Sequence, residues 1–147
     1  MKLRQRFDMD DFLCYCSLGV VAPLLVYVSG PYEDVSVHAV ERNVRNLSLV
    51  CRRILRCGHI PVCPTLMTVG WEGDPSFAKK EAVWWVENVN AAFMAICDVF
   101  CYLRREGERV EAERRLWRKT AGGDEVPADM IMDYLLRKNA EAILDDE

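Results

Sequence analysis

Two acidic residues and one tyrosine stand where the sequence predicts a strand or the start of a helix: Tyr27, Asp98 and Glu111. A carboxylate such as Glu111 can attack the anomeric carbon of a sugar and form a covalent glycosyl intermediate, because displacement there passes through an oxocarbenium-like state. A second group must protonate the leaving group, and Asp98 is the available acid. These residue types suit cleavage of a glycosidic bond.

Two arginines, Arg105 and Arg109, flank Gly107 where the helix that carries Glu111 is predicted to begin. The free N–H groups of a helix N-terminus attract phosphate or carboxylate, and arginine adds a planar fork of donors. The 5′-phosphate of a nucleotide could therefore lie beside these two arginines.

Each candidate also has a purely structural interpretation. Glu111 lies in a run of alternating charge, residues 106–115, that is typical of a solvated helix face. Asp98 can cap the entrance of a strand or pair with an arginine. Tyr27 lies on a central strand and could belong to the core. The sequence leaves these alternatives open.

Alternating strands and helices must position these residues. Residues 24–29 form a continuous apolar run that ends at Gly30 and Pro31, which is typical of a strand buried on both faces of a parallel sheet. The next segment is amphipathic, and it predicts a helix capped by Ser36 and closed by Gly58. The other predicted elements are strands at 60–63 and 98–103, a loop at 65–76, helices at 77–96, 109–119 and 128–144, and a break at 121–125.

This order of strands and helices predicts an α/β fold of three layers, with a small parallel sheet between helices and right-handed crossovers. Open α/β sheets bind ligands outside the carboxyl ends of their strands. The loops at 30–32, 64–76 and 104–108 therefore form the candidate site.

Composition and motifs exclude several classes of function. The chain has 147 residues and a formal net charge of −4, which gives a nucleic-acid polymer no obvious electrostatic partner. The sequence contains no G-x-G-x-x-G, no Walker lysine and no G-x-S-x-G motif. We expect no cofactor.

The seven cysteines fall largely within apolar runs and form no C-x-x-C motif. This pattern predicts reduced thiols in a cytoplasmic protein rather than a disulfide framework. Cys57 and His59 are close in sequence, but further ligands at suitable spacing are absent, so we expect no metal site.

Residues 12–28 carry no charge and follow Lys2, Arg4 and Arg6, which resembles a signal peptide or membrane anchor. Acidic residues between the basic residues and this run, and Pro23 within it, argue against that interpretation. We expect no membrane partner, an N-terminal extension at 1–23 and one domain at 24–147.

Several motifs together resemble the nucleoside 2-deoxyribosyltransferase-like superfamily, most closely its short phage and bacterial members of unknown function. The resemblance covers about residues 24–119. Its motifs are Tyr27-Val-Ser-Gly-Pro-Tyr32, a helix with Asn43 and Asn46, Gly58-His-Ile-Pro-Val-Cys-Pro64, Leu66-Met-Thr-Val-Gly-Trp-Glu72 and Cys97-Asp-Val-Phe.

This resemblance implies a flavodoxin-like fold and a glutamate nucleophile on the first turn of the helix after the third strand. Glu111 matches that glutamate, with Gly107 four residues before it, and Tyr27 matches the tyrosine that orients it. The substrate-binding residues on this basis are Ser29, Gly30, Pro31, Tyr32, Asn90, Arg105, Gly107 and Arg109.

The chain departs from the family pattern at three of these positions. Arg105 replaces a serine, Arg109 replaces a glycine, and Asn90 replaces an aspartate that contacts the base. We therefore expect either binding of a nucleoside or nucleotide with cleavage of its N-glycosidic bond, or a non-catalytic binding or assembly module on the same fold.

The strand after the third helix, at residues 124–127, is too short to be obvious in the sequence, which leaves one edge of the sheet exposed. The superfamily is also oligomeric. We expect a homodimer or a larger homo-oligomer.

Overall fold

The computed structural model describes residues 22–77, 80, 82–103 and 107–145. Four parallel strands form one sheet in the order β2-β1-β3-β4. They are β1 (Leu25–Ser29), β2 (Ile60–Val62), β3 (Val99–Tyr102) and β4 (Glu125–Pro127). The predicted α/β class and parallel sheet are confirmed, and the strand order is that of a flavodoxin-like fold.

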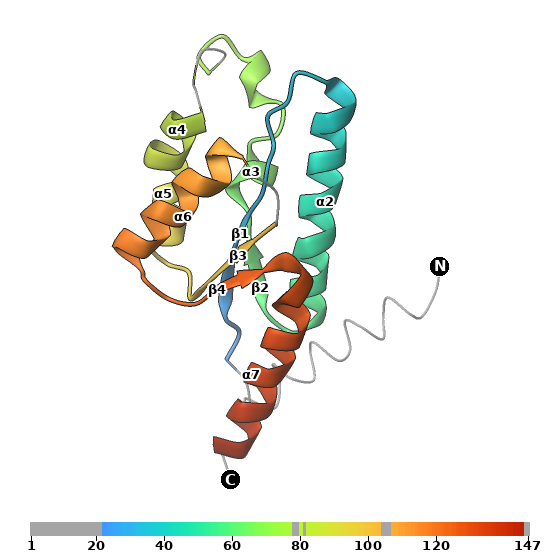
Figure 1. Ribbon diagram of the computed structural model, residues 1–147, viewed down its shortest axis with the longest axis vertical. Helices are drawn as coiled ribbons and strands as arrows, with labels where there is room; N and C mark the ends of the chain where they lie inside the picture. Colours follow the sequence, from blue (N-terminus) through green and yellow to red (C-terminus); the bar gives the residue numbers. More distant parts are fainter. Residues whose placement is uncertain (1–21, 78–79, 81, 104–106, 146–147) are drawn as a thin grey trace.

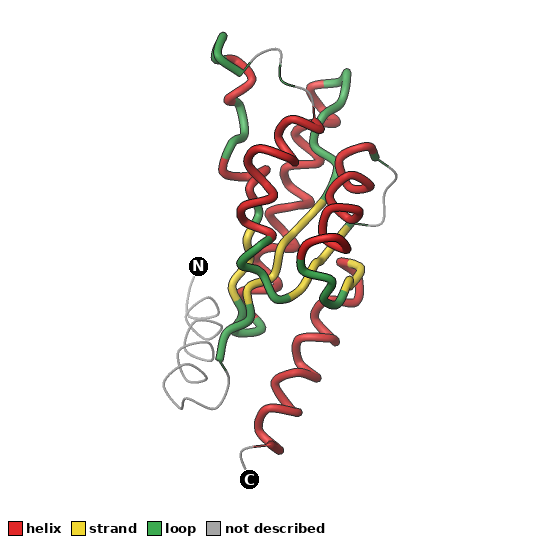
Figure 2. The backbone as a smooth tube through the Cα atoms, turned by 90° about the vertical axis from the view of Figure 1, so that its left-hand side faces the viewer, coloured by secondary structure: helices red, strands yellow, loops and turns green. Residues whose placement is uncertain are grey.

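Helices cover both faces of this sheet (Figure 1). On one face lie α2 (Val37–Arg56) and α7 (Ile131–Asp145), which follows the short 3-10 turn η3 (Ala128–Met130). On the other lie α4 (Ala82–Trp85), the π-helical segment η2 (Val86–Asn90), α5 (Ala91–Met94) and α6 (Glu108–Thr120). Figure 2 shows that α7 continues well beyond the ends of the strands.

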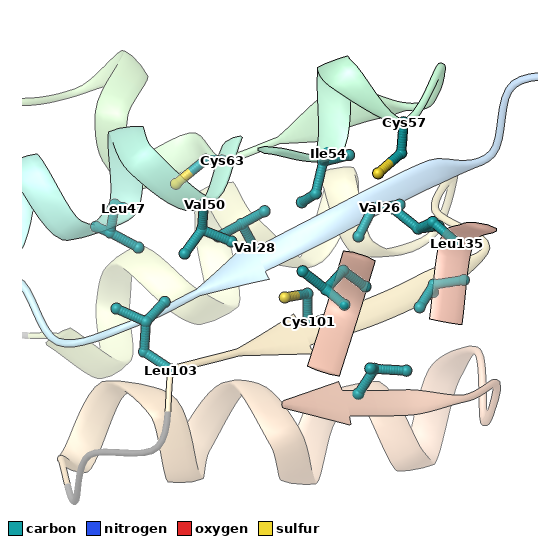
Figure 3. Close-up of a cluster of buried hydrophobic side chains, with 13 residues drawn as sticks. Val26, Val28, Leu47, Val50, Ile54, Cys57, Cys63, Cys101, Leu103 and Leu135 are labelled. Atoms are coloured by element: carbon teal, nitrogen blue, oxygen red, sulfur yellow. The ribbon is translucent and has the colours of Figure 1, made fainter. Parts of the chain in front are cut away.

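The alternation of side chains along β1 divides the core into two clusters. Val26 and Val28 pack with the inner faces of α2 and α7, among them Leu47, Ile54 and Leu135 (Figure 3). On the opposite face of the sheet, Tyr27 of β1 and Phe100 of β3 pack against Trp117 of α6 and Met94 of α5. The rings of Tyr27 and Phe100 stack at 5.6 Å. Every second residue of β1 is thereby directed toward α6.

Local signals set the ends of α2 as predicted. The Ser36 hydroxyl accepts a hydrogen bond from the Ala39 backbone N–H at 3.4 Å. Gly58, one residue beyond the C-cap Cys57, has a φ of 85°, which is a conformation that side-chain-bearing residues rarely adopt.

Three elements differ from the sequence prediction. The expected helix at 77–96 is shorter and contains a π-helical turn, and Lys80 lies outside it. The expected loop at 65–76 contains α3 (Pro64–Met67), whose first residue is proline, and the 3-10 turn η1 (Trp71–Gly73). Residues 121–125 were predicted as a break, yet β4 begins at Glu125, because Val126 pairs with Cys101 in the sheet.

Candidate functional site

A carboxylate is buried at the interface between α6 and the sheet. Glu113 has 1% of its surface exposed. It lies on the inner face of α6 because Val110 and Trp117, at three and four residues from it, anchor that face in the core. This places Glu113 opposite the two β1 residues that point toward α6, Tyr27 and Ser29.

The Glu113 carboxylate is surrounded by the polar groups of Asn90, Tyr27, Ser29 and Arg109. Asn90 Nδ2 donates a hydrogen bond to Glu113 Oε1 at 3.3 Å. The hydroxyls of Tyr27 and Ser29 are close enough to lower the pKa of Glu113. Among the described residues, however, neither hydroxyl nor Glu113 Oε2 has a hydrogen-bond partner of good geometry. Buried polar atoms without partners are uncommon, and they are typical of sites that bind a ligand.

Burial dominates the protonation of Glu113. The loss of solvent raises its pKa from 4.5 to about 7, although Tyr27, Arg109, Ser29 and Asn90 all act to lower it. The same burial, reinforced by the Glu113 carboxylate, raises the pKa of Tyr27 well above its usual value. With this raised pKa both the acid and the carboxylate form of Glu113 are accessible near neutral pH, and perturbed pKa values of this kind cluster at functional sites.

The π-helical segment η2 ends at Asn90 and directs this side chain toward α6. A π-helical turn inserts one residue into an α-helix and rotates the residues that follow, and such turns are frequent at functional sites. Asn90 is buried, as are Tyr27 and Ser29 on β1.

Arg109 lies one helical turn before Glu113 on α6 and has 6% of its side chain exposed. Its Nε donates to Glu33 Oε2 at 3.1 Å, and its Nη2 donates to Glu33 Oε1. Loss of solvent acts to lower the pKa of Arg109, but Glu33 and Glu113 together raise it, so the guanidinium stays charged. It also lies 5.9 Å from the centre of the Tyr32 ring.

A cavity of about 190 Å³ opens beside this arginine. It is lined by Tyr32, Glu33, Asp34, Val40, Thr68, Lys80, Trp85 and Arg109. Larger hollows of about 420, 320 and 310 Å³ lie over other parts of the fold, and their walls include none of the residues around Glu113. The smaller cavity is the better ligand site because it shares Arg109 with the buried carboxylate and contains two aromatic rings.

The structure brings most of the predicted site residues together at the carboxyl end of the sheet. Tyr27, Ser29, Asn90 and Arg109 surround one carboxylate, which we call the Glu113 site. Tyr32 lines the cavity, and Asn43 on α2 holds the loop before it by donating to the Tyr32 carbonyl at 3.2 Å.

Three further predicted residues help to shape this end of the sheet. A Cβ at Gly30 would meet Leu47 at 2.8 Å, and one at Gly107 would meet Pro31 at 3.9 Å. Arg105 lies outside the described residues.

The expected position of Glu111 is wrong. Its side chain is 62% exposed and lies 4.0 Å from Arg114, on the solvent face of α6. Residues two apart on a helix point about 200° from each other, so Glu111 cannot share the inner face with Glu113. The spacing of Val110 and Trp117 was the signal that distinguishes the two glutamates.

The expected placement of Asp98 is also wrong. It precedes β3, at the amino end of the sheet, whereas Ser29 and the start of α6 lie at the carboxyl end. Its Oδ2 accepts a hydrogen bond from the Leu25 backbone N–H at 2.8 Å. Asp98 therefore caps the entrance of β1, and it cannot protonate a ligand beside Glu113.

The described residues form no group of three or more histidine, cysteine, aspartate or glutamate side chains able to hold a metal ion. Within the same residues, no helix is long and apolar enough to span a membrane.

No protein-family model matches the chain, and a search of curated proteins found no match. The resemblance noted in the sequence therefore remains an expectation.

Proposed function

We propose that this chain binds a nucleoside or nucleotide and cleaves its N-glycosidic bond with Glu113 as the nucleophile. The observation that carries the proposal is the Glu113 site: a buried carboxylate faced by two hydroxyls without hydrogen-bond partners among the described residues, beside a cavity with aromatic walls. This site lies at the junction of β1 and β3, where the strand order of the sheet reverses.

The reaction begins with the ionised Glu113 carboxylate. One oxygen bonds to C1′ of the sugar while the bond from C1′ to the base breaks, and the base leaves with the electron pair and takes a proton from water. Water then attacks C1′ and releases Glu113. The Tyr27 and Ser29 hydroxyls face the carboxylate and are placed to orient it toward C1′ when a substrate is bound, and Asn90 holds Oε1 by its hydrogen bond.

The cavity wall includes Arg109 but not Glu113. A sugar must therefore displace Arg109 or pass beside it to reach the carboxylate. The aromatic rings of Tyr32 and Trp85 suit the flat face of a base, and the polar loop residues suit the hydroxyls of a sugar.

The test is incubation with a panel of deoxynucleosides and their 5′-monophosphates, with the released base measured. Glu113→Gln removes the attacking anionic oxygen and keeps the shape of the side chain, so turnover should fall by roughly 100-fold or more. Because the nucleophile must be ionised, kcat/KM of the unmodified protein should rise with pH through about 7.

Glu111→Gln is the matched control, since it makes the same change on the solvent face of the same helix. It should retain full turnover. Retained turnover in Glu113→Gln would reject the nucleophile, and an equal loss in both variants would indicate a diffuse electrostatic effect.

The alternative is a non-catalytic nucleotide-binding or assembly module on the same fold. It is favoured by one observation, the near-complete burial of Glu113 behind Arg109. Thermal stabilisation by a nucleoside or nucleotide without release of base from any of them would establish it.

We also propose a cytoplasmic location. The five described cysteines, Cys51, Cys57, Cys63, Cys97 and Cys101, are free thiols, and four of them are buried. Such thiols persist in a reducing compartment. Rapid alkylation of cells lysed directly into denaturant, which exposes the buried thiols, should label all seven cysteines of the chain.

A further inference from the structure

The guanidinium of Arg109 forms a binding site for an anion that the protein fills with its own carboxylate. Arg109 is fixed on α6 and almost wholly buried, and both oxygens of Glu33 accept hydrogen bonds from it. This two-point geometry is the one by which arginine binds either a carboxylate or a phosphate. Glu33 thus takes the place that a phosphate group of a ligand would need.

The charges around the cavity also disfavour a second anion. Two carboxylates, Glu33 and Asp34, and two cations, Lys80 and Arg109, line its wall. The Glu33 and Arg109 charges offset each other, and the Lys80 ammonium lies 4.7 Å from the centre of the Trp84 ring. A phosphate monoester carries roughly −1.5 to −2 charges at neutral pH. It would bring this charge beside two carboxylates in a partly desolvated space.

A hydroxyl group of a ligand, unlike a phosphate, is attracted to the Glu33 carboxylate. Glu33 keeps 48% of its side chain exposed, and a carboxylate oxygen has lone pairs beyond those that Arg109 uses. A sugar hydroxyl can donate to this carboxylate without displacing it. Recognition of a hydroxyl by a charged acceptor held rigidly in place gives strong discrimination against a group that cannot donate.

We infer that Glu33 is a specificity-determining residue that makes the cavity select unphosphorylated nucleosides and reject their monophosphates. The inference rests on the proposed function, since it names the substrate class of the same site. Arg109 then acts as a positioning residue for Glu33, and phosphate selectivity depends on their pairing.

The first experiment measures affinities of deoxynucleosides and the corresponding 5′-monophosphates for the full chain by calorimetry. The unmodified protein should bind the nucleoside at least about tenfold more tightly than its monophosphate. Glu33→Ala frees Arg109, so the preference should disappear or reverse. Asp34→Ala removes the neighbouring carboxylate of the same wall, which is not bonded to Arg109, so it should weaken the preference without removing or reversing it.

A second experiment uses inorganic phosphate and needs no nucleoside. Phosphate should raise the melting temperature of Glu33→Ala but not that of the unmodified protein or of Asp34→Ala. Glu33→Gln provides the same comparison with the side-chain volume kept, in case the alanine variant folds poorly. It should also gain phosphate binding.

The outcomes separate the inference from the proposed function. Tighter binding of the monophosphate by the unmodified protein would overturn the inference and leave the proposed function standing. Failure of both Glu33 variants to gain phosphate binding would overturn it as well. If phosphate binding appears in these variants while no nucleoside or nucleotide binds any form, the anion site stands and the proposed function fails.

Discussion

Glu113 carries an ionisable group into the core, and its burial couples folding to pH. Folding raises the pKa of this carboxyl from 4.5 to about 7. Between these values the unfolded chain has lost the proton and the folded chain still holds it, so stability falls as pH rises. Below 4.5 both states are protonated. Above about pH 7 the loss of stability is complete, and the difference in pKa corresponds to about 3 kcal/mol of unfolding free energy.

We expect Glu113→Gln to abolish this dependence because glutamine is neutral at every pH. Relative to the unmodified protein, the variant should gain about 3 kcal/mol of unfolding free energy between pH 4 and pH 8. Urea denaturation at the two pH values measures this difference. Glu111→Gln, on the solvent face, should show no such gain. If the difference in unfolding free energy between Glu113→Gln and the unmodified protein were the same at pH 4 and pH 8, the effect assigned to burial would be contradicted.

The charge and motif pattern of the sequence predicted the parts of the site on β1 but not its central residue, which only the apolar spacing of Val110 and Trp117 indicates. Tyr27 and Ser29 belong to a short apolar strand whose alternation directs both side chains to one face. Glu113 belongs to a helix in which eight of thirteen residues are charged, so charge pattern alone places no glutamate inside. The partner of Arg109, Glu33, is distant in sequence, and no local rule connects them.

At the scale of elements, close packing between α2 and the end of β1 depends on a missing side chain. A Cβ at Gly30 would lie 2.8 Å from Leu47 and 3.0 Å from Leu103, and both leucines are buried. Gly30→Ala should therefore lower the unfolding free energy by about 1–3 kcal/mol, because the core must shift to admit the methyl group. Urea denaturation measures the change.

Gly73→Ala is the control for this prediction. No atom of the described residues lies within 4 Å of a Cβ at Gly73, and its φ is not positive, so the substitution should change stability by less than about 0.5 kcal/mol. Equal changes in unfolding free energy for Gly30→Ala and Gly73→Ala would mean that the close contacts of a Cβ at Gly30 do not destabilise the fold.

A buried polar network joins α7 to the end of α2. His59 Nδ1 accepts from the Leu24 backbone N–H at 2.9 Å, so Nε2 carries the proton and donates to Asn139 Oδ1 at 2.7 Å. Asn139 Nδ2 in turn donates to the Cys57 carbonyl at 3.0 Å. One side chain of α7 thus satisfies two buried groups of the α2–β2 connection.

Asn139→Ala should lower the unfolding free energy by about 2 kcal/mol or more, because it leaves a buried donor and a buried acceptor unpaired. Thermal and urea denaturation measure this loss. Asn88→Ala also removes one hydrogen bond to a backbone carbonyl, at 2.9 Å, but at an exposed position, and it should cost much less. A smaller loss for Asn139→Ala than for Asn88→Ala would argue against the network.

Local signals predict some elements and miss others for physical reasons. Ser36 and Gly58 mark the ends of α2 because capping acts through neighbouring backbone groups. The π-helical turn that ends at Asn90 depends on packing against α6, which no periodicity in the sequence records. β4 is defined by pairing with β3, and its short polar sequence carries little preference of its own.

At the scale of the whole molecule, the fold follows from the order of its elements, and the assembly does not. Each buried strand is followed by a helix, and a parallel sheet is the arrangement that buries them all. The edges of this sheet are β2 and β4, each of three residues and each containing a proline. Because β4 is formed, these short edges give little reason for subunits to pair through the sheet.

Self-association is better predicted from α7. Its inner face, Ile131, Leu135 and Asn139, packs on the sheet and α2. A second apolar stripe on the same helix is exposed, and the helix itself extends beyond the strands (Figure 2). It consists of Met132, Leu136 and Ile143. An apolar stripe that no part of the described chain covers is typical of a protein interface.

We therefore expect a homodimer or larger homo-oligomer by light scattering at micromolar concentration, with α7 in the interface. Leu136→Glu places a charge in the middle of the stripe, where pairing would require its desolvation, so the variant should dissociate at least about tenfold more readily. Arg137→Gln, at the adjacent position on α7, changes the net charge by the same one unit and should leave the mass unchanged. A monomeric unmodified protein would contradict the prediction, and equal dissociation of the two variants would remove the stripe from the interface.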